Sequence, residues 1–326
     1  MLNRRRLVAA AATSALAFAP TGRALAQAST PGRICAGFPP GSSADNLSRV
    51  LAQKLGAAGM PFIVENRTGA GGRLAVESIK TSVPDGQSLL VTPDVMMVLY
   101  PHVFKTLAYD PVKDFRAITT LATVPVAFAV GPLVPASVKT LTDFAKWCKA
   151  YPQTASFGTS GAGTTLHFTG VMFARASNVE LTHVPYRGAN LAAQDTAAGQ
   201  IASCVGVLTD LLPLAQAGKM RLLGVSTPAR SRFAPEVPTF RESGFKDIES
   251  ITWFGLYAPA RTPDDRVKAL HAATVGAFQQ ADVVETLAKF AFEPKTMPSE
   301  QFAELMRSDT DRWRAVVKDV GYTAIE

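Results

Sequence analysis

Short apolar stretches of strand length alternate with helical stretches through the first third of this 326-residue chain. The pattern predicts strands over 33–38, 61–66 and 87–93, with helices over 46–59 and 74–82. Strand, loop and helix in repeated succession indicate a parallel sheet with helices on its faces. This order constrains the fold more than any other feature of the sequence.

The same alternation starts again in the middle of the chain. It predicts helices over 141–152, 164–177, 189–199 and 209–219, and strands over 154–160, 181–185, 200–208 and 220–227. Two apolar passages, residues 124–132 and 251–259, join the halves, and three helices near 263–279, 282–290 and 299–318 follow. We therefore expect two α/β halves with a cleft, divided into residues 27–128 with 253–326 and residues 129–252.

The N-terminus has the layout of a cleaved export signal. Arg4, Arg5 and Arg6 precede an apolar run over residues 7–19, and Ala24-Leu25-Ala26 is a small-x-small ending. The run is too short to span a bilayer permanently. Residues 3–8 also resemble a twin-arginine signal. We expect cleavage near Ala26 and a periplasmic mature protein without a lipid anchor.

Charge and metal-binding residue types exclude several classes of function. The formal net charge of +7 falls to +3 once residues 1–26 are removed, because they hold four arginines and no acid. No basic patch remains that would suggest nucleic acid. The three cysteines are widely spaced, and Cys35 and Cys204 lie in apolar runs typical of buried thiols. The four histidines lack metal-ligand spacing, so neither a metal nor another cofactor is expected.

Two loops between a strand and a helix are rich in small polar residues. They cover residues 38–45 (FPPGSSAD) and 160–167 (SGAGTTLH). The first amides of a helix lack partners within the helix and bind anions without a basic side chain. Asp45 has the spacing either to close its own helix or to contact a ligand. Thr164 is the expected N-cap, and His167 either leaves the amides free for an anion or orients the neighbouring loop.

The second loop also comes close to the nucleophile elbow of α/β-hydrolases. Gly158-x-Ser160-x-Ala162 lacks the second glycine of that motif. The chain order serine, acid, histidine leaves only His183 or His271 as a base, and neither has a catalytic signature nearby. The sequence therefore favours binding over hydrolysis.

The sequence resembles one known family through nearly all of the mature chain. The matching segments include GFPPGSSAD, FIVENRTGAGG, PDGQSLLVT, ASFGTSGAGTTLHF, HVPYRGA and AGKMRLLGVST. In this order and spacing they resemble the periplasmic substrate-binding proteins of tripartite tricarboxylate transporters, also called Bug (Bordetella uptake gene) proteins. The resemblance implies a type II periplasmic-binding-protein fold, with two Rossmann-like lobes that close on a small carboxylate or an amino-acid-like compound.

The resemblance also implies which residues bind the ligand, largely through main-chain groups and waters. In one lobe they are Phe38, Pro40, Ser42, Ser43 and Asp45, with Thr92 and Pro93 at the end of the third strand. In the other lobe they are Ser160, Gly161, Gly163, Thr164, His167, Pro185 and Tyr186.

The chain departs from the family at two places. Ser42 replaces a usual glycine in the first loop, and residues 203–208, where relatives carry a polar or acidic residue, are largely apolar. The second departure argues against an amino acid, whose ammonium group would need a carboxylate. It favours an acid with an apolar body, or a dicarboxylate.

The expected function is capture of a small organic anion for membrane permease subunits by a monomeric solute-binding protein without catalysis. A periplasmic sensor that signals to a regulatory partner remains the alternative, and a serine hydrolase the third.

Overall fold

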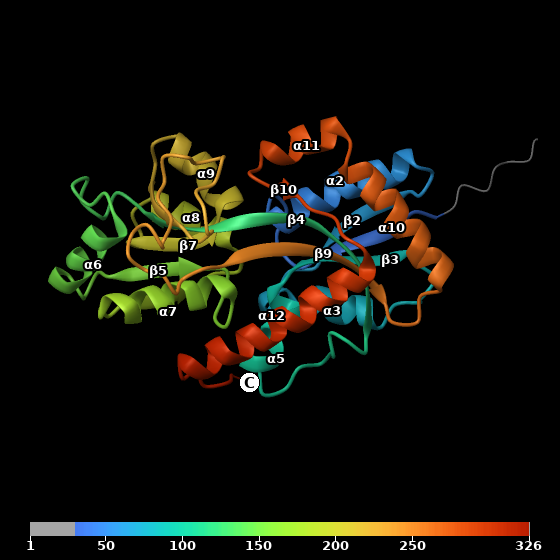
Figure 1. The fold of residues 1–326 in the computed structure, drawn as a ribbon, viewed down its shortest axis with the longest axis horizontal. Coiled ribbons are helices and arrows are strands. Elements are labelled where there is room, and N and C mark those ends of the chain that lie inside the picture. The colour runs from blue at the N-terminus through green and yellow to red at the C-terminus, as the bar shows by residue number, and fades with distance from the viewer. Residues whose placement is uncertain (1–29, 326) are drawn as a thin grey trace, which may run out of the picture. The chain divides into compact units, whose positions relative to one another are not determined.

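The computed structural model describes residues 30–325, and the predicted export signal lies outside them (Figure 1). The first predicted α/β unit is confirmed. Strands β1 (Gly32–Ala36), β2 (Phe62–Asn66) and β3 (Ser88–Pro93) pair in parallel with β1 in the middle. Helix α2 (Ser43–Ala57) follows β1, and a short turn η1 (Ala70–Gly72) leads from β2 into α3 (Arg73–Lys80).

The second predicted unit is confirmed as well. Strands β6 (Thr182–Pro185) and β7 (Ser203–Val207) pair in parallel with β5 (Ser156–Thr159) between them. The helices of this unit are α6 (Leu141–Ala150), α7 (Thr165–Ser177), α8 (Ala189–Ala197) and α9 (Leu208–Gln216). Strand β8 (Arg221–Val225) pairs antiparallel with the long strand described next.

One long strand, β4 (Phe115–Val130), pairs with strands of both units and makes them one continuous sheet (Figure 1). It pairs antiparallel with β9 (Ile251–Pro259) up to Pro125, and from Val126 onward it pairs with β7 and β8. Both passages were predicted from the sequence, but the first begins at Phe115, nine residues earlier than predicted. Its expectation of a parallel sheet is also incomplete, because these apolar strands give no sign of their direction.

The remaining elements complete the first unit. Helices α4 (Val95–Val98) and α5 (Tyr100–Val103) were not predicted, since each is a single turn. The C-terminal part contains α10 (Asp264–Phe278), α11 (Ala281–Ala288), β10 (Glu293–Pro294) and α12 (Ser299–Asp319). Helix α12 packs against β4, α4 and α5 and buries Phe302 and Trp313.

The predicted lobe boundaries, at 128/129 and 252/253, fall inside the two long strands. From Pro31 onward the chain forms one compact unit by its internal contacts, so the division into two lobes stays a prediction. Cys35, Cys148 and Cys204 are buried free thiols, as expected for the first and third. None of the described helices has the length and apolarity needed to cross a membrane.

Candidate functional site

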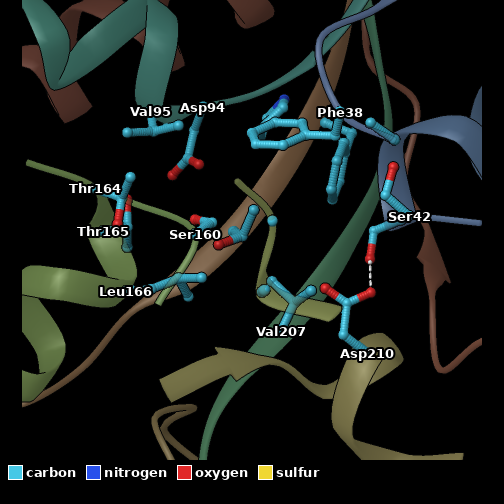
Figure 2. A pocket seen from close by; sticks show the side chains of 17 residues that line it. Phe38, Ser42, Asp94, Val95, Ser160, Thr164, Thr165, Leu166, Val207 and Asp210 are labelled. Atoms are coloured by element: carbon cyan, nitrogen blue, oxygen red, sulfur yellow. Dashed lines mark hydrogen bonds between the residues drawn. The ribbon is translucent and has the colours of Figure 1, made fainter. Parts of the chain in front are cut away.

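A cavity lies where the two predicted loops face each other (Figure 2). Its walls leave about 510 Å³ free of atoms, a volume that includes open solvent at its mouth. Six of the predicted site residues line it: Phe38, Ser42, Ser43, Pro93, Ser160 and Thr164.

The N-terminus of α2 forms one wall of the cavity. Ser42 is the N-cap, and its hydroxyl accepts a hydrogen bond from the Asp45 amide at 3.4 Å. The amides of Ser43 and Ala44, the first two of the helix, have no acceptor within residues 30–325. Both residues line the cavity, so α2 brings two free donors and the positive end of its dipole to this wall.

The N-terminus of α7 forms another wall in the same way. Thr164 is the N-cap, as predicted, and its hydroxyl accepts from the His167 amide at 3.2 Å. The next two amides, of Thr165 and Leu166, also lack an acceptor in the described chain. Because both residues line the cavity, the two helices together offer four free amides to one space.

No Lys, Arg or His occurs among the residues that line this cavity. An anion bound here would therefore be neutralised by backbone amides, helix dipoles and hydroxyl groups. Phe38, Leu166, Val207 and Phe254 supply apolar surface beside these donors. The cavity therefore suits a small molecule with a carboxylate end and an apolar body.

Asp45 does not line the cavity. Its carboxylate accepts hydrogen bonds at 2.9 Å each from Gly41 N, Asn66 Nδ2 and Arg49 Nε. Burial alone would raise the pKa of Asp45, but these hydrogen bonds outweigh it and hold the pKa below its ordinary value. Of the two roles considered, the geometry favours closure of its own helix and loop.

His167 does not line the cavity either, and of its two expected roles the geometry favours orientation of the neighbouring loop. Its Nδ1 accepts a hydrogen bond from the Gly163 amide at 3.2 Å, so the ring takes a loop amide instead of leaving it free. The ring lies against His183, with centroids 4.1 Å apart. Burial lowers the pKa of His167 to about 4, and burial together with His167 lowers that of His183 to about 3. Both histidines are therefore neutral at pH 7.

The other predicted residues lie around the cavity without lining it. Pro40 and Pro185 are exposed. Thr92 is buried, and its hydroxyl donates a hydrogen bond to Met96 Sδ. The Tyr186 hydroxyl donates to Asp195 Oδ2 at 2.8 Å. Backbone conformation explains the two glycines better than direct contact does, since Gly161 has φ +142° and Gly163 has φ +72°.

Asp210 is a cavity residue that the sequence analysis missed. It lies in the first turn of α9, two residues beyond the run 203–208 that appeared apolar, and its carboxylate accepts from Ser43 Oγ at 3.0 Å (Figure 2). Burial raises its pKa to about 7, although the Ser43 hydrogen bond opposes the shift. The expectation that this region offers no acidic group is therefore wrong. Its position two residues beyond the run 203–208 was the available signal.

Asp94 is the second acidic residue missed. It follows Pro93 directly, at the carboxyl end of β3, and is 1% exposed. Neither carboxyl oxygen has a hydrogen-bond partner in the described structure. Burial raises its pKa well above the ordinary value, and the nearby Asp309 raises it further. Its position one residue beyond the predicted pair Thr92 and Pro93 was the available signal.

Comparison with known proteins identifies the family. The model of the tripartite tricarboxylate transporter family receptor matches residues 43–322. The chain belongs to this receptor family. The expectation drawn from the sequence motifs is therefore confirmed.

Individual relatives of this receptor match along most of their length. A protein of Cupriavidus necator, named for its position in the gbd 5' region, is 35% identical over 98% of both chains. The structure of R. palustris Rpa4515 with adipate has a TM-score of 0.87 and 26% identity, covering 90% of this chain and 98% of that one. MatC from Rhodopseudomonas palustris with bound malate has a TM-score of 0.81 and 28% identity, covering 88% and 98%. These likenesses confirm the periplasmic-binding-protein fold.

The near-elbow serine, Ser160, is a cavity residue of this receptor. Within residues 30–325, Ser160 Oγ makes no hydrogen bond to a histidine. The two histidines nearest the loop are engaged elsewhere, His183 Nε2 with Thr159 Oγ1 at 2.7 Å and His167 Nδ1 with Gly163. Ser160 lines the cavity as a neutral hydroxyl, which suits a ligand contact.

Proposed function

We propose that this receptor binds a small organic acid in the periplasm and presents it to the permease subunits of a tripartite tricarboxylate transporter. One observation carries the proposal. Four residues line one cavity with amides that have no acceptor in the described chain, and no residue of that lining is basic: Ser43, Ala44, Thr165 and Leu166. Such amides at two helix N-termini stabilise a carboxylate from two sides. The predicted export signal and a monomeric state are parts of the same proposal.

The relatives support an organic acid as the ligand. Rpa4515 was obtained with adipate and MatC with malate, and both share the fold of this chain. Adipate and malate differ in length and in polar substituents. Their shared carboxylates are what the amides of α2 and α7 would recognise here.

Binding without turnover is the second part of the proposal. The chemistry of ester hydrolysis needs a base within hydrogen-bonding reach of the serine. Ser160 has none within the described chain, and the neutral His167 and His183 hold other partners. An assay with a chromogenic ester should therefore show no turnover that depends on Ser160.

A thermal-shift screen of the mature, ligand-free protein tests the proposal. Carboxylates of three to six carbons should raise the melting temperature, because they bind the folded state preferentially. The primary amides of the same acids serve as matched controls and should have little effect. Stabilisation by sugars or by the amides, with none by any carboxylate, would contradict the proposal.

A further inference from the structure

Asp94 is held in place by its backbone, although neither oxygen of its side chain has a hydrogen-bond partner within residues 30–325. Its amide donates to Trp253 O at 2.9 Å, and its carbonyl accepts from Met97 N at 2.8 Å and Val98 N at 3.0 Å. The carboxyl group points from the start of α4 toward the side of the cavity where Ser160 and Thr164 lie (Figure 2). The backbone therefore fixes an unpaired carboxyl group against the ligand space.

Such a group is costly unless something compensates for it. A buried carboxylate without a hydrogen bond or a counter-ion is strongly destabilised. Both oxygens of Asp94 lack a hydrogen-bond partner within the described chain, and burial raises its pKa, which favours the neutral acid. A ligand that enters the cavity can supply the missing partner.

The protein's own charged groups near Asp94 do not supply that partner. Asp309, from α12, is a like charge. The nearby cation, Arg312, places its Nε 3.3 Å from Asp309 Oδ1, and Trp253 Nε1 donates to the other oxygen of Asp309 at 2.6 Å. The hydroxyl of Tyr257, also close to Asp94, is buried without a hydrogen bond. None of these groups forms a hydrogen bond with the Asp94 carboxyl group in the described chain, and Asp94 lines the cavity.

We propose that Asp94 accepts a hydrogen bond from a protonated amine of the ligand, so that this receptor selects amino acids over dicarboxylates. The inference rests on the proposed function, because the ligand carboxylate is assigned to the amides of α2 and α7. Asp210 adds a second acidic group to the same cavity, and no lining residue is basic. A dianion would meet two acidic groups there, whereas a zwitterion matches amides at one end and Asp94 at the other.

Titration calorimetry with matched pairs of acids tests the proposal. The pairs are 4-aminobutanoate with succinate, 5-aminopentanoate with glutarate and 6-aminohexanoate with adipate, supplemented by glutamate. At whichever length fits, the amino acid should bind wild type about tenfold or more tightly than its diacid. Asp94→Asn should lose that preference. Asp309→Asn is the matched control, because it removes a neighbouring carboxylate outside the cavity lining and should keep the preference.

Proton release gives a second reading of the same complexes. Burial raises the pKa of Asp94 in the ligand-free protein, and an ammonium group bound beside it would lower that pKa and so favour release of a proton. The binding heat of an amino acid to wild type should therefore differ between phosphate and Tris buffers. The difference should equal the number of protons released multiplied by the difference between the ionisation heats of the two buffers. Asp94→Asn should lose this difference. A diacid bound through a neutral Asp94 that donates to its second carboxylate would release no proton.

The outcomes separate this inference from the proposed function. Tighter binding of the diacid at every length, or an amino-acid preference unchanged in folded Asp94→Asn, would overturn the inference and leave carboxylate capture intact. Failure of every amino acid, diacid and monocarboxylate to bind would overturn both. The relative affinity of wild type for amino acids and for their matched diacids is measured without any variant. The selectivity can therefore be refuted even where Asp94→Asn is poorly folded.

Discussion

The N-termini of α2 and α7 are built alike in their first two residues and differently in the third. In both, an N-cap hydroxyl takes the third amide and leaves the first two facing the cavity. The third residue is Asp45 in one and His167 in the other, yet both side chains turn back onto their own loops. The two helix ends therefore share their backbone geometry, while the side chain of the third residue only holds the loop in place.

The two ends also differ across the cavity. Ser43, the first residue of α2, donates to Asp210 at 3.0 Å and so joins its helix to the opposite wall. Its counterpart Thr165, the first residue of α7, has a buried hydroxyl without a partner in the described chain. One helix end is thus connected to an acidic group that titrates near neutral pH, and the other keeps a hydroxyl available to the ligand.

The largest expected effect concerns Asp210, the partner found only on the α2 side. Its folded pKa of about 7 exceeds the ordinary value of 3.8, so its contribution to stability is complete below pH 4 and is lost as the pH rises to 7. Asp210→Asn mimics the protonated form. In urea titrations the variant should match wild type at pH 4 and exceed it at pH 7 by at most about 4 kcal/mol. The residue keeps some open surface, which reduces the difference.

On acidification, His167 and His183 lower the unfolding free energy, whereas Asp210 raises it. Because both histidines are present in wild type and in Asp210→Asn, their effects cancel in the difference between the two proteins. Their pKa values lie below the ordinary value of 6.5, so they destabilise the fold as the pH falls from 6.5 toward 4. Asp210→Asn should therefore lose stability on acidification more steeply than wild type. A difference between the two proteins that does not vary with pH would contradict the assignment.

A pair of glycines compares the tolerance of the two loops. Gly41 (φ +80°) and Gly163 (φ +72°) both need the left-handed region, and a side chain there costs about 1–2 kcal/mol. A Cβ at Gly41 meets nothing within 4 Å, whereas one at Gly163 lies 3.0 Å from Val103 Cγ2. Gly163→Ala should therefore lower the unfolding free energy and the ligand affinity more than Gly41→Ala. Equal losses in chemical denaturation would show that this contact does not matter.

The smallest effect separates the two N-caps. Ser42→Ala removes the acceptor of one amide, at 3.4 Å, and should lower the unfolding free energy by about 1 kcal/mol. The Thr164 hydroxyl also donates to Gly161 O at 2.9 Å, so Thr164→Ala loses two hydrogen bonds and should cost nearer to about 2 kcal/mol. Thermal unfolding of the ligand-free variants measures both. A larger loss from Ser42→Ala would reverse the comparison.

Local sequence pattern accounts for what was predicted and for what was not. Helices, strands and the Thr164 cap follow from residues close together in the chain, and these predictions are confirmed. The direction of the His167 ring depends on His183 from another strand. Asp94 and Asp210 lie one and two residues beyond segments that the sequence had singled out, but only the assembly of β3, β7 and the loops brings both to one cavity. Strands β4 and β9 are more than a hundred residues apart in the sequence, so their antiparallel pairing could not be predicted from local pattern either.

Ligand binding is proposed to depend on backbone amides at the two helix ends, and proline at the first position of α7 removes one of them. Proline is well tolerated there, and the preceding Thr164 (φ −90°, ψ 161°) already has the conformation it requires. Thr165→Val is the matched control, because it loses the hydroxyl and keeps the amide.

Titration calorimetry of both variants, with whichever of adipate and 6-aminohexanoate binds wild type more tightly, gives the most direct test. A charge-assisted hydrogen bond contributes about 1.5–3 kcal/mol, so Thr165→Pro should bind at least about tenfold more weakly than wild type. Thr165→Val should stay within about a few-fold of wild type, as expected for one neutral hydrogen bond. Wild-type affinity in folded Thr165→Pro would contradict the amide cradle.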